Sequence, residues 1–414
     1  MNKNIFLLWQ GQFVSLLGTQ AYTIAMMFWL MENTASPILM SLIMALGSLP
    51  SLVFGPVAGV LADRCSRKMI IVLCDLIRAI ATLLLSILLF IDGIDIYWLI
   101  SAFFLLALIN GTARAFFQPA IMAWLPDLTS KQQLPKTMAF FESSNQLAQI
   151  IGQVLAGGLY RFFGAPLLLL FDAISYGVSA FSEFFIDEST ALPQKPIDEF
   201  KNKYQKYKVD LIAGFHYVKA QKGMFSFICF TASVNFFLAP FMLLLPFYVA
   251  EQLQQQAHWY GLLLAAMAVG VIVGLWLSAK VSLFGHRRAQ LMFGAMFLLA
   301  ITLLWLSQTQ LAWLALMLLF LVGLSIGLFQ LQSMTLLQLS TPSALRGRVM
   351  SLSLAIAQGG IPIGLLLGGG GASLTDNNVS FIYCTVAIMI ALLTTFICCR
   401  SNVINFLFSL PKQA

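Results

Sequence analysis

Long apolar stretches alternate with short polar segments along the whole chain. Most stretches run for about twenty residues or more, which lets one helix cross roughly 30 Å of hydrocarbon. Dividing the chain at its polar and helix-breaking positions predicts twelve membrane-spanning helices. The predicted spans are residues 5–31, 37–62, 69–91, 96–126, 136–163, 166–186, 223–250, 258–280, 288–307, 311–338, 346–371 and 378–400. The pattern therefore predicts an all-α membrane protein with twelve transmembrane helices.

One long polar segment, residues 187–222, interrupts this pattern and leaves six predicted spans on either side. We therefore expect an N-terminal six-helix bundle over residues 1–186 and a C-terminal six-helix bundle over residues 223–414. Within the polar segment, a basic stretch precedes an amphipathic run at 209–218. This order predicts a cytoplasmic linker with a helix lying on the inner membrane surface.

The basic residues are distributed unequally between the two ends of the predicted spans. With the N-terminus inside, the outer side holds only Arg161, at the outer end of the fifth predicted span, while Arg78 and Arg114 lie within spans. The positive-inside rule then predicts that both termini are cytoplasmic, as in a multi-pass protein of the inner membrane. The formal net charge of +7 is explained by this topology and by contact with anionic lipid. We expect no nucleic-acid partner.

Composition restricts the function further. The chain is 60% hydrophobic and 9% charged, whereas a soluble globular domain is about 25% charged. A soluble protein is therefore excluded, because this much apolar surface could not be buried. The sequence has no Walker phosphate loop, and its cysteines lack metal or redox spacing. We expect no cofactor, no metal and no enzymatic activity.

The connection between the second and third predicted spans carries a compact charged motif. Residues 59–68 read GVLADRCSRK. This string resembles the loop between the second and third helices of the major facilitator superfamily, whose pattern is G-x-L-a-D-r-x-G-r-K, with Ser66 in place of the usual Gly. The resemblance implies two six-helix repeats about a midplane site, with transport by alternating access. The gate residues that it implies are Gly59, Asp63, Arg64, Arg67, Lys68 and Asp127.

The resemblance also implies what these charges do. Asp63 would lie against the N-terminal end of the eleventh span, near Gly347. Arg67 would bridge to Asp127 at the end of the fourth span. Both contacts would hold the cytoplasmic side closed and would break when that side opens. A loop that its cations merely anchor at the membrane surface is the alternative.

Four further motifs, at residues 75–78, 171–176, 346–349 and 361–364, resemble the macrolide-efflux and enterobactin-exporter branch of this superfamily. That resemblance favours export of a drug-like or siderophore-like amphipathic molecule. Two departures weaken it, because Gln153 stands where exporters carry Pro and Ala107 where they carry a buried Arg. An importer or facilitator of a small solute is the alternative, and a non-transporting receptor or assembly factor is a remoter one.

Ionisable residues inside the predicted spans each need a partner or a function, since insertion of one costs about 2.5–3.5 kcal/mol. In the N-terminal half they are Asp75, Arg78, Arg114, Glu142 and Asp172. Asp75 and Arg78 are three residues apart and can pair on one helix face. Glu142 has polar neighbours, and partial burial favours the protonated form of its carboxyl. We therefore expect proton coupling at Glu142, then at Asp75 or Asp172. The alternatives are structural roles for Asp75 and Asp172 and, for Glu142, either an interfacial position or a pair with Arg114.

The resemblance implies that spans 1, 4, 7 and 10 face a central cavity. Amide and aromatic side chains there suit a bulky amphipathic molecule. The predicted lining residues are Gln10, Gln20, Tyr22, Asn145, Asn235, Phe237, Gln332 and Gln358. The sequence thus predicts a monomeric, proton-coupled secondary transporter whose partners are a small-molecule substrate, protons and the lipid bilayer.

Overall fold

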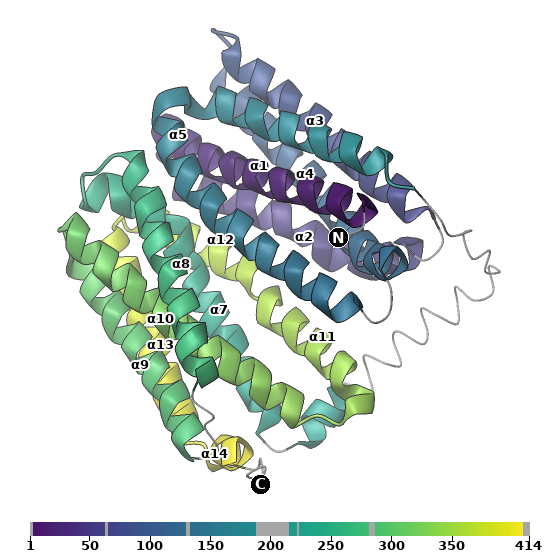
Figure 1. Cartoon of the computed structure of the whole chain (residues 1–414). Helices are drawn as coiled ribbons and strands as arrows, with labels where there is room; N and C mark the ends of the chain where they lie inside the picture. Colours follow the sequence, from purple (N-terminus) through teal and green to yellow (C-terminus); the bar gives the residue numbers. More distant parts are fainter. Residues whose placement is uncertain are drawn as a thin grey trace. The chain divides into compact units, whose positions relative to one another are not determined.

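The computed structural model of the chain describes residues 3–62, 65–129, 133–187, 215–221, 223–280 and 286–408 (Figure 1). All regular structure in these ranges is helical. The helices are α1 (Lys3–Thr34), α2 (Pro37–Ala62), α3 (Arg67–Phe90), α4 (Ile96–Leu128), α5 (Leu134–Phe184), α7 (Met224–Phe247), the π-helix η1 (Tyr248–Gln252), α8 (Ala257–Lys280), α9 (His286–Gln308), α10 (Ala312–Leu339), α11 (Ser343–Gly359), α12 (Ile361–Leu374), α13 (Val379–Cys398) and α14 (Ser401–Phe408).

Helix α5 contains two predicted spans in one continuous element. Its backbone changes direction at Gly164, where φ is 66° and ψ is −178°. This conformation is open almost only to Gly. Pro166 follows, and its ring cannot continue an upstream helix without the loss of a hydrogen bond. We name residues 134–163 the first segment of α5 and residues 165–184 its second segment. They correspond to the fifth and sixth predicted spans.

The twelve predicted spans are present in the described part of the chain. Ten helical stretches are long and apolar enough to cross a membrane when α5 is counted once. The second segment of α5 and α2, which is apolar over Pro37–Ser51, bring the number to twelve. The eleventh span consists of α11 and α12, which meet at Gly360. The predicted all-α, twelve-helix membrane fold is confirmed.

The chain divides into two compact units. The first comprises Met1–Ala35 and Leu42–Tyr204, and the second comprises Ser36–Ser41 and Gln205–Ala414. Most of the predicted linker lies outside the described residues, so its bounds remain predictions. At the edge of the predicted surface helix, residues 215–220 are helical.

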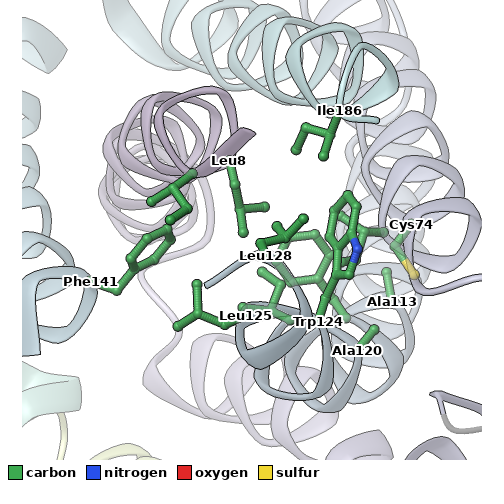
Figure 2. Packing of buried hydrophobic residues seen from close by; sticks show 13 residues of the cluster. Leu8, Cys74, Ala113, Ala120, Trp124, Leu125, Leu128, Phe141 and Ile186 are labelled. Carbon is green, nitrogen blue, oxygen red and sulfur yellow. The ribbon is translucent and has the colours of Figure 1, made fainter. Parts of the chain in front are cut away.

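In the first unit, α5 packs against both α1 and α3, and α3 also packs against α4. At one end of this unit, apolar side chains from four helices converge around Trp124 of α4 (Figure 2). Leu8 of α1, Cys74 of α3 and Phe141 of α5 belong to the same cluster. Dispersion between such closely packed groups stabilises helix contacts even where lipid surrounds the bundle. The cluster holds these four helices together at the end of the unit where α3 begins and α4 ends.

In the second unit, α8 and α10 approach each other along small residues. The glycines at this contact are Gly270, Gly274, Gly323 and Gly327. An ideal Cβ at Gly323 would lie 1.9 Å from the carbonyl oxygen of Met267, and one at Gly270 would lie 2.1 Å from that of Phe320. Glycines four residues apart on each helix therefore allow direct contact between the two backbones, a frequent arrangement in membranes.

Helix α3 separates lipid-facing from protein-facing side chains clearly. Leu73, Ile80 and Leu84 are 52%, 59% and 57% exposed, whereas Asp75 is fully buried and Arg78 is 7% exposed. In a bilayer this arrangement places apolar side chains against the acyl chains and charged groups inside the bundle. The charged face of α3 is therefore directed toward the interior of the first unit.

Candidate functional site

Three helices of the first unit contribute polar side chains to one buried region, which we name the polar seam. The second segment of α5 is bonded to both other helices, since Gln12 of α1 donates to Glu183 and the Ser86 hydroxyl of α3 donates to the carbonyl of Pro166. Its members are Gln12, Ser15, Thr19 and Tyr22 of α1, Asp75, Arg78, Thr82 and Ser86 of α3, and Asp172, Ser175, Tyr176, Ser179 and Glu183 of α5. All are buried except Thr19, which is half-buried.

The spacing of these residues explains why they meet. On α1 and α3 they recur at intervals of three or four residues, which places them on one face of each helix. On α5 the same interval runs from Asp172 through Ser175 and Ser179 to Glu183. The rise from Asp172 to Glu183 is about 16 Å. The seam therefore extends through about half of the hydrocarbon layer.

Arg78 lies at the centre of the charges in the seam. Its Nη1 atom is 3.7 Å from Oδ1 of Asp75, which confirms the predicted pairing of these two residues. The guanidinium also lies over the rings of Phe117 and Tyr176, with its Cζ atom 5.0 Å and 5.4 Å from the ring centroids. Aromatic faces stabilise a cation that has lost its water. Arg78 additionally interacts electrostatically with Asp172 and Glu183.

The three carboxyl groups differ in their hydrogen bonds. Neither oxygen of Asp75 or Asp172 takes part in a hydrogen bond among the described residues. Glu183 Oε1, in contrast, accepts one from Gln12 Nε2 at 2.9 Å and one from the Ser179 hydroxyl at 3.4 Å. Its Oε2 atom is buried without a partner in the described part of the chain. Glu183 is therefore the carboxyl through which the seam is bonded to α1.

Helix α1 approaches α5 very closely at the other half of the seam. An ideal Cβ at Gly18 would lie 2.1 Å from Ser175 Oγ and 2.7 Å from Asp172 Oδ1. One residue further along α1, the Thr19 hydroxyl lies 2.9 Å from that of Tyr176. The missing side chain of Gly18 thus creates the space in which the Asp172 carboxyl is accommodated.

A second set of charged residues lies where α3 begins and α4 ends. Arg67 forms an ion pair with Asp127 across the ends of these helices, so the predicted contact is present. Lys68 Nζ donates to the backbone carbonyl of Ile186 at 2.9 Å and lies 5.2 Å from the centroid of the Phe184 ring. The start of α3 is thereby attached to the ends of both α4 and α5. The gating role of these contacts remains a prediction.

Several predicted residues cannot be placed in this arrangement. Asp63 and Arg64 lie outside the described residues, as does the side chain of Glu142, and Gly59 is near the end of α2. The proposed contact of Asp63 and the proton-carrying role of Glu142 therefore stay predictions. Arg114 is exposed on α4, where its charge interacts with that of Arg78.

Two of the predicted cavity residues are instead buried inside a single unit. Tyr22 is 8% exposed, and its hydroxyl donates to Met26 Sδ at 3.5 Å. Gln332 is 5% exposed, and its amide donates to Ser278 Oγ at 3.0 Å between α10 and α8. The helix faces that carry them meet neighbouring helices, and this corrects the expectation that they line an open cavity.

Other predicted cavity residues also join helices. The amide of Gln10 donates to Ser182 Oγ at 2.9 Å, and that of Asn235 donates to the carbonyl of Ala357 at 3.2 Å. Both side chains are half-buried, so one part of each remains accessible. The remaining predicted residues, half-buried or exposed, are Gln20, Asn145, Phe237 and Gln358. Their contact with a substrate stays a prediction.

Glu183 was missing from the sequence-based candidates. The sixth predicted span ends at residue 186, so Glu183 falls in its last turn, where a charged residue is ordinary. The structure places its side chain at 0% exposure against α1. The available signal was the recurrence of polar residues every three or four positions from Asp172 to Glu183, which indicates a polar face that continues to the end of the helix.

Comparisons with known proteins agree with this architecture. "Macrolide efflux protein A" of Streptococcus pyogenes is 26% identical over 366 residues, which is 87% of each chain. The protein of the same name from Enterococcus faecalis is 25% identical over 77% of this chain and 97% of its own. "Multidrug resistance protein 2" of Bacillus subtilis is 27% identical over 52% of each chain.

Solved structures show the same fold at low sequence identity. The nucleoside transporter NupG superposes with a TM-score of 0.69 at 11% identity, over 96% of this chain and 99% of that one. A bacterial homologue of the iron transporter ferroportin gives a TM-score of 0.71 at 13% identity, over 96% and 99% of the two chains. The family model of the Major Facilitator Superfamily matches residues 8–365. Together with the twelve helices, this match shows that the chain belongs to the Major Facilitator Superfamily and is a multi-pass membrane transporter.

Proposed function

We propose that the protein exports a drug-like or siderophore-like amphipathic molecule from the cytoplasm and that the proton gradient drives this export. The similarity to proteins named for macrolide efflux supports the direction of transport and the class of substrate. The protein would act as a monomer in the inner membrane, with both termini cytoplasmic. It needs no cofactor in this mechanism, and the transported molecule leaves chemically unchanged.

The observation that carries the proton coupling is the polar seam. Asp75, Asp172 and Glu183 are three carboxyls at 0% exposure, and Arg78 is the one cation buried beside them in the described part of the chain. Ionised groups at membrane depth are expensive, and in transporters they commonly belong to proton pathways. A purely structural ion pair would require one acid for Arg78. The two further acids support a proton-binding function.

The chemistry of the predicted cavity residues supports an amphipathic substrate. They are amides and aromatic residues, which offer scattered hydrogen bonds and flat apolar surfaces. A strongly anionic substrate would require paired cations. Among the described residues of the first unit's spans, Arg114 and Arg161 are exposed cations, but Arg161 lies near the end of the first segment of α5, whereas Arg114 lies in the middle of α4. They do not offer a mid-span pair, and this weighs against organophosphate exchange.

The ion pair of Arg67 with Asp127 supports the gating part of the proposal. Both side chains are partly accessible, with 21% and 30% exposure, so water can compete for the pair. Exposed pairs of this kind contribute only about 0–1 kcal/mol. Such a contact can break and re-form during each transport cycle without a large energetic barrier.

The test uses purified protein in liposomes that contain a pH-sensitive dye. Under an imposed proton gradient, macrolides, dyes and siderophores are added one at a time. We expect proton flux that starts with substrate addition and is abolished by Asp172→Asn, while Glu32→Gln, a matched change of an exposed acid, leaves it intact. Comparison with Glu142→Gln decides whether Glu142, as the sequence predicts, or the polar seam carries the proton.

An importer or facilitator is the second candidate. Ala107, where exporters carry a buried Arg, packs in the α2–α4 contact beside Gly47, with its carbonyl oxygen 3.7 Å from an ideal Cβ there. The long cationic side chain of an Arg at position 107 would have no space in this contact. Substrate movement without proton flux would favour this candidate. So would a lower content of the compound in cells that lack the protein, because an exporter's absence would raise that content. A protein that moved none of the compounds would fit a receptor.

A further inference from the structure

We propose that Glu183 is the carboxyl that exchanges protons between the polar seam and water, and that its hydrogen bond with Gln12 transmits the change to α1. This inference rests on the proposed proton coupling and deepens it. It assigns the coupling to the second segment of α5 and to a residue pair outside the predicted proton carriers. Its first support is the position of Glu183 within the seam.

Glu183 is the seam carboxyl nearest to an aqueous end of the unit. It lies in the last turn of α5, which ends at Phe184. One turn beyond it, Asp187 is exposed, and the carbonyl of Ile186 binds the ammonium group of Lys68 at 2.9 Å. Asp172, in contrast, lies about 16 Å deeper along the helix. A proton that enters from this end therefore reaches Glu183 first.

The balance of charges supports proton storage in the seam. The charged or titratable groups that interact with Glu183 are Asp75, Arg78 and Cys74 of α3. Lys68 of α3 lies over the neighbouring Phe184 ring. Deeper in the seam, Asp172 and Tyr176 of α5 interact with Arg78 and with Tyr22 of α1, and Arg114 of α4 interacts with Arg78. Within the buried part, three acids oppose one guanidinium. Even with the exposed Arg114 included, full ionisation would leave excess negative charge on carboxyls that are fully buried. Desolvation of an unpaired carboxylate is costly, so the closed seam holds at least one proton.

The contact of Glu183 with Gln12 converts protonation into a change at α1. As a carboxylate, Glu183 accepts the Gln12 amide hydrogen at 2.9 Å. As a carboxylic acid it becomes a donor on one oxygen, and a neutral acceptor forms a weaker hydrogen bond than a charged one. Gln12 is 8% exposed, so a hydrogen bond to water cannot compensate for this weakening. Protonation therefore weakens one attachment of α1 to α5.

The tests combine transport with direct observation of carboxyl protonation in the intact protein. Infrared spectra recorded during a pH titration resolve the carbonyl band of protonated carboxylic acids. We expect Glu183→Gln to remove the titrating band and to abolish substrate-triggered proton flux, while exchange of labelled substrate at equal pH on both sides continues. Glu32→Gln is the matched control and should change none of the three readouts.

The role of Gln12 has its own readout. Gln12→Leu should retain the carboxyl band, shift the pH at which it titrates and lower the ratio of protons to substrate. Gln332→Leu, which removes a buried amide from the second unit, should leave the band and this ratio unchanged. If Gln12 had only a structural role, Gln12→Leu would lower the amount of folded protein, and the carboxyl band would titrate at the same pH as in the wild-type protein.

The outcomes separate this inference from the proposed function. If the wild-type protein couples protons to substrate and Glu183→Gln does so equally well, the inference is overturned and the proposed function stands. If the wild-type protein moves substrate without protons, the proposed function fails, and the coupling role of Glu183 fails with it. If Glu183→Gln is not recovered folded, the titration of Gln12→Leu decides, and an unshifted band overturns the inference.

Discussion

Replacement of Gly323 by Ala tests whether the contact between α8 and α10 depends on direct backbone packing. The added Cβ would lie 1.9 Å from the carbonyl oxygen of Met267. Ordinary contact requires about 3.5 Å, so the two helices must separate by roughly 1.5 Å at this point. The obstructing atom belongs to the backbone of α8 and cannot rotate away. The contact must therefore widen instead of adjusting locally.

The expected effect follows from two opposing contributions. Overpacking of this kind costs about 1–3 kcal/mol, and the better helix propensity of Ala returns up to about 1 kcal/mol. Since the clash is with backbone, we take the upper overpacking cost of about 3 kcal/mol. Subtracting about 1 kcal/mol for helix propensity leaves an expected net loss of about 2 kcal/mol. Thermal unfolding of the purified protein in detergent, followed by intrinsic fluorescence, should show a midpoint lowered by several degrees.

The matched control is Gly294→Ala on α9, where an added Cβ meets nothing within 4 Å. This variant gains helix propensity without a clash, so its midpoint should stay the same or rise slightly. Equal midpoints for the two variants would show that α8 and α10 are not held at this distance, and would refute the reasoning.

Three other substitutions test the first unit. Gly18→Ala should abolish transport, because its Cβ would lie 2.7 Å from Asp172 Oδ1, and the liposome flux assay measures this loss. Gly164→Ala should lower the unfolding midpoint, since a residue with a side chain at φ 66° and ψ −178° costs about 1–3 kcal/mol. An unchanged midpoint would show that position 164 does not require Gly. Arg67→Ala should change stability by no more than about 1 kcal/mol but alter the transport rate, and exchange of the charges between Arg67 and Asp127 should restore that rate. If the exchanged charges did not restore the transport rate, the ion pair of Arg67 with Asp127 would not be part of the gate.

Most of the fold could be predicted from the sequence because the bilayer restricts the possible structures. Spanning segments must be apolar and helical, so hydropathy locates them without knowledge of their packing. The break between the fifth and sixth spans was placed at residues 163–166, and the structure places it at Gly164. The division of the eleventh span at Gly360 was missed, since Gly within an apolar run does not by itself indicate a break.

The candidate site could be predicted only in part, because it depends on which helix faces meet. The pairing of Asp75 with Arg78 was accessible, as both lie on one helix. The polar seam was not, because Gln12, the partner of Glu183 on α1, is 171 positions away in the sequence. Gln332 was misassigned for the same reason, since its face meets Ser278 of α8 rather than an open cavity.

The absence of a loop at Gly164 makes the register of α5 sensitive to chain length. Each residue in an α-helix advances the side-chain direction by about 100°. A single residue inserted between the two segments of α5 would therefore turn Asp172 and Glu183 away from α1 and α3 together. The loops that join other spans can accept such an insertion by bulging outward. At this junction the number of residues itself determines whether the carboxyls face the bundle interior or the lipid.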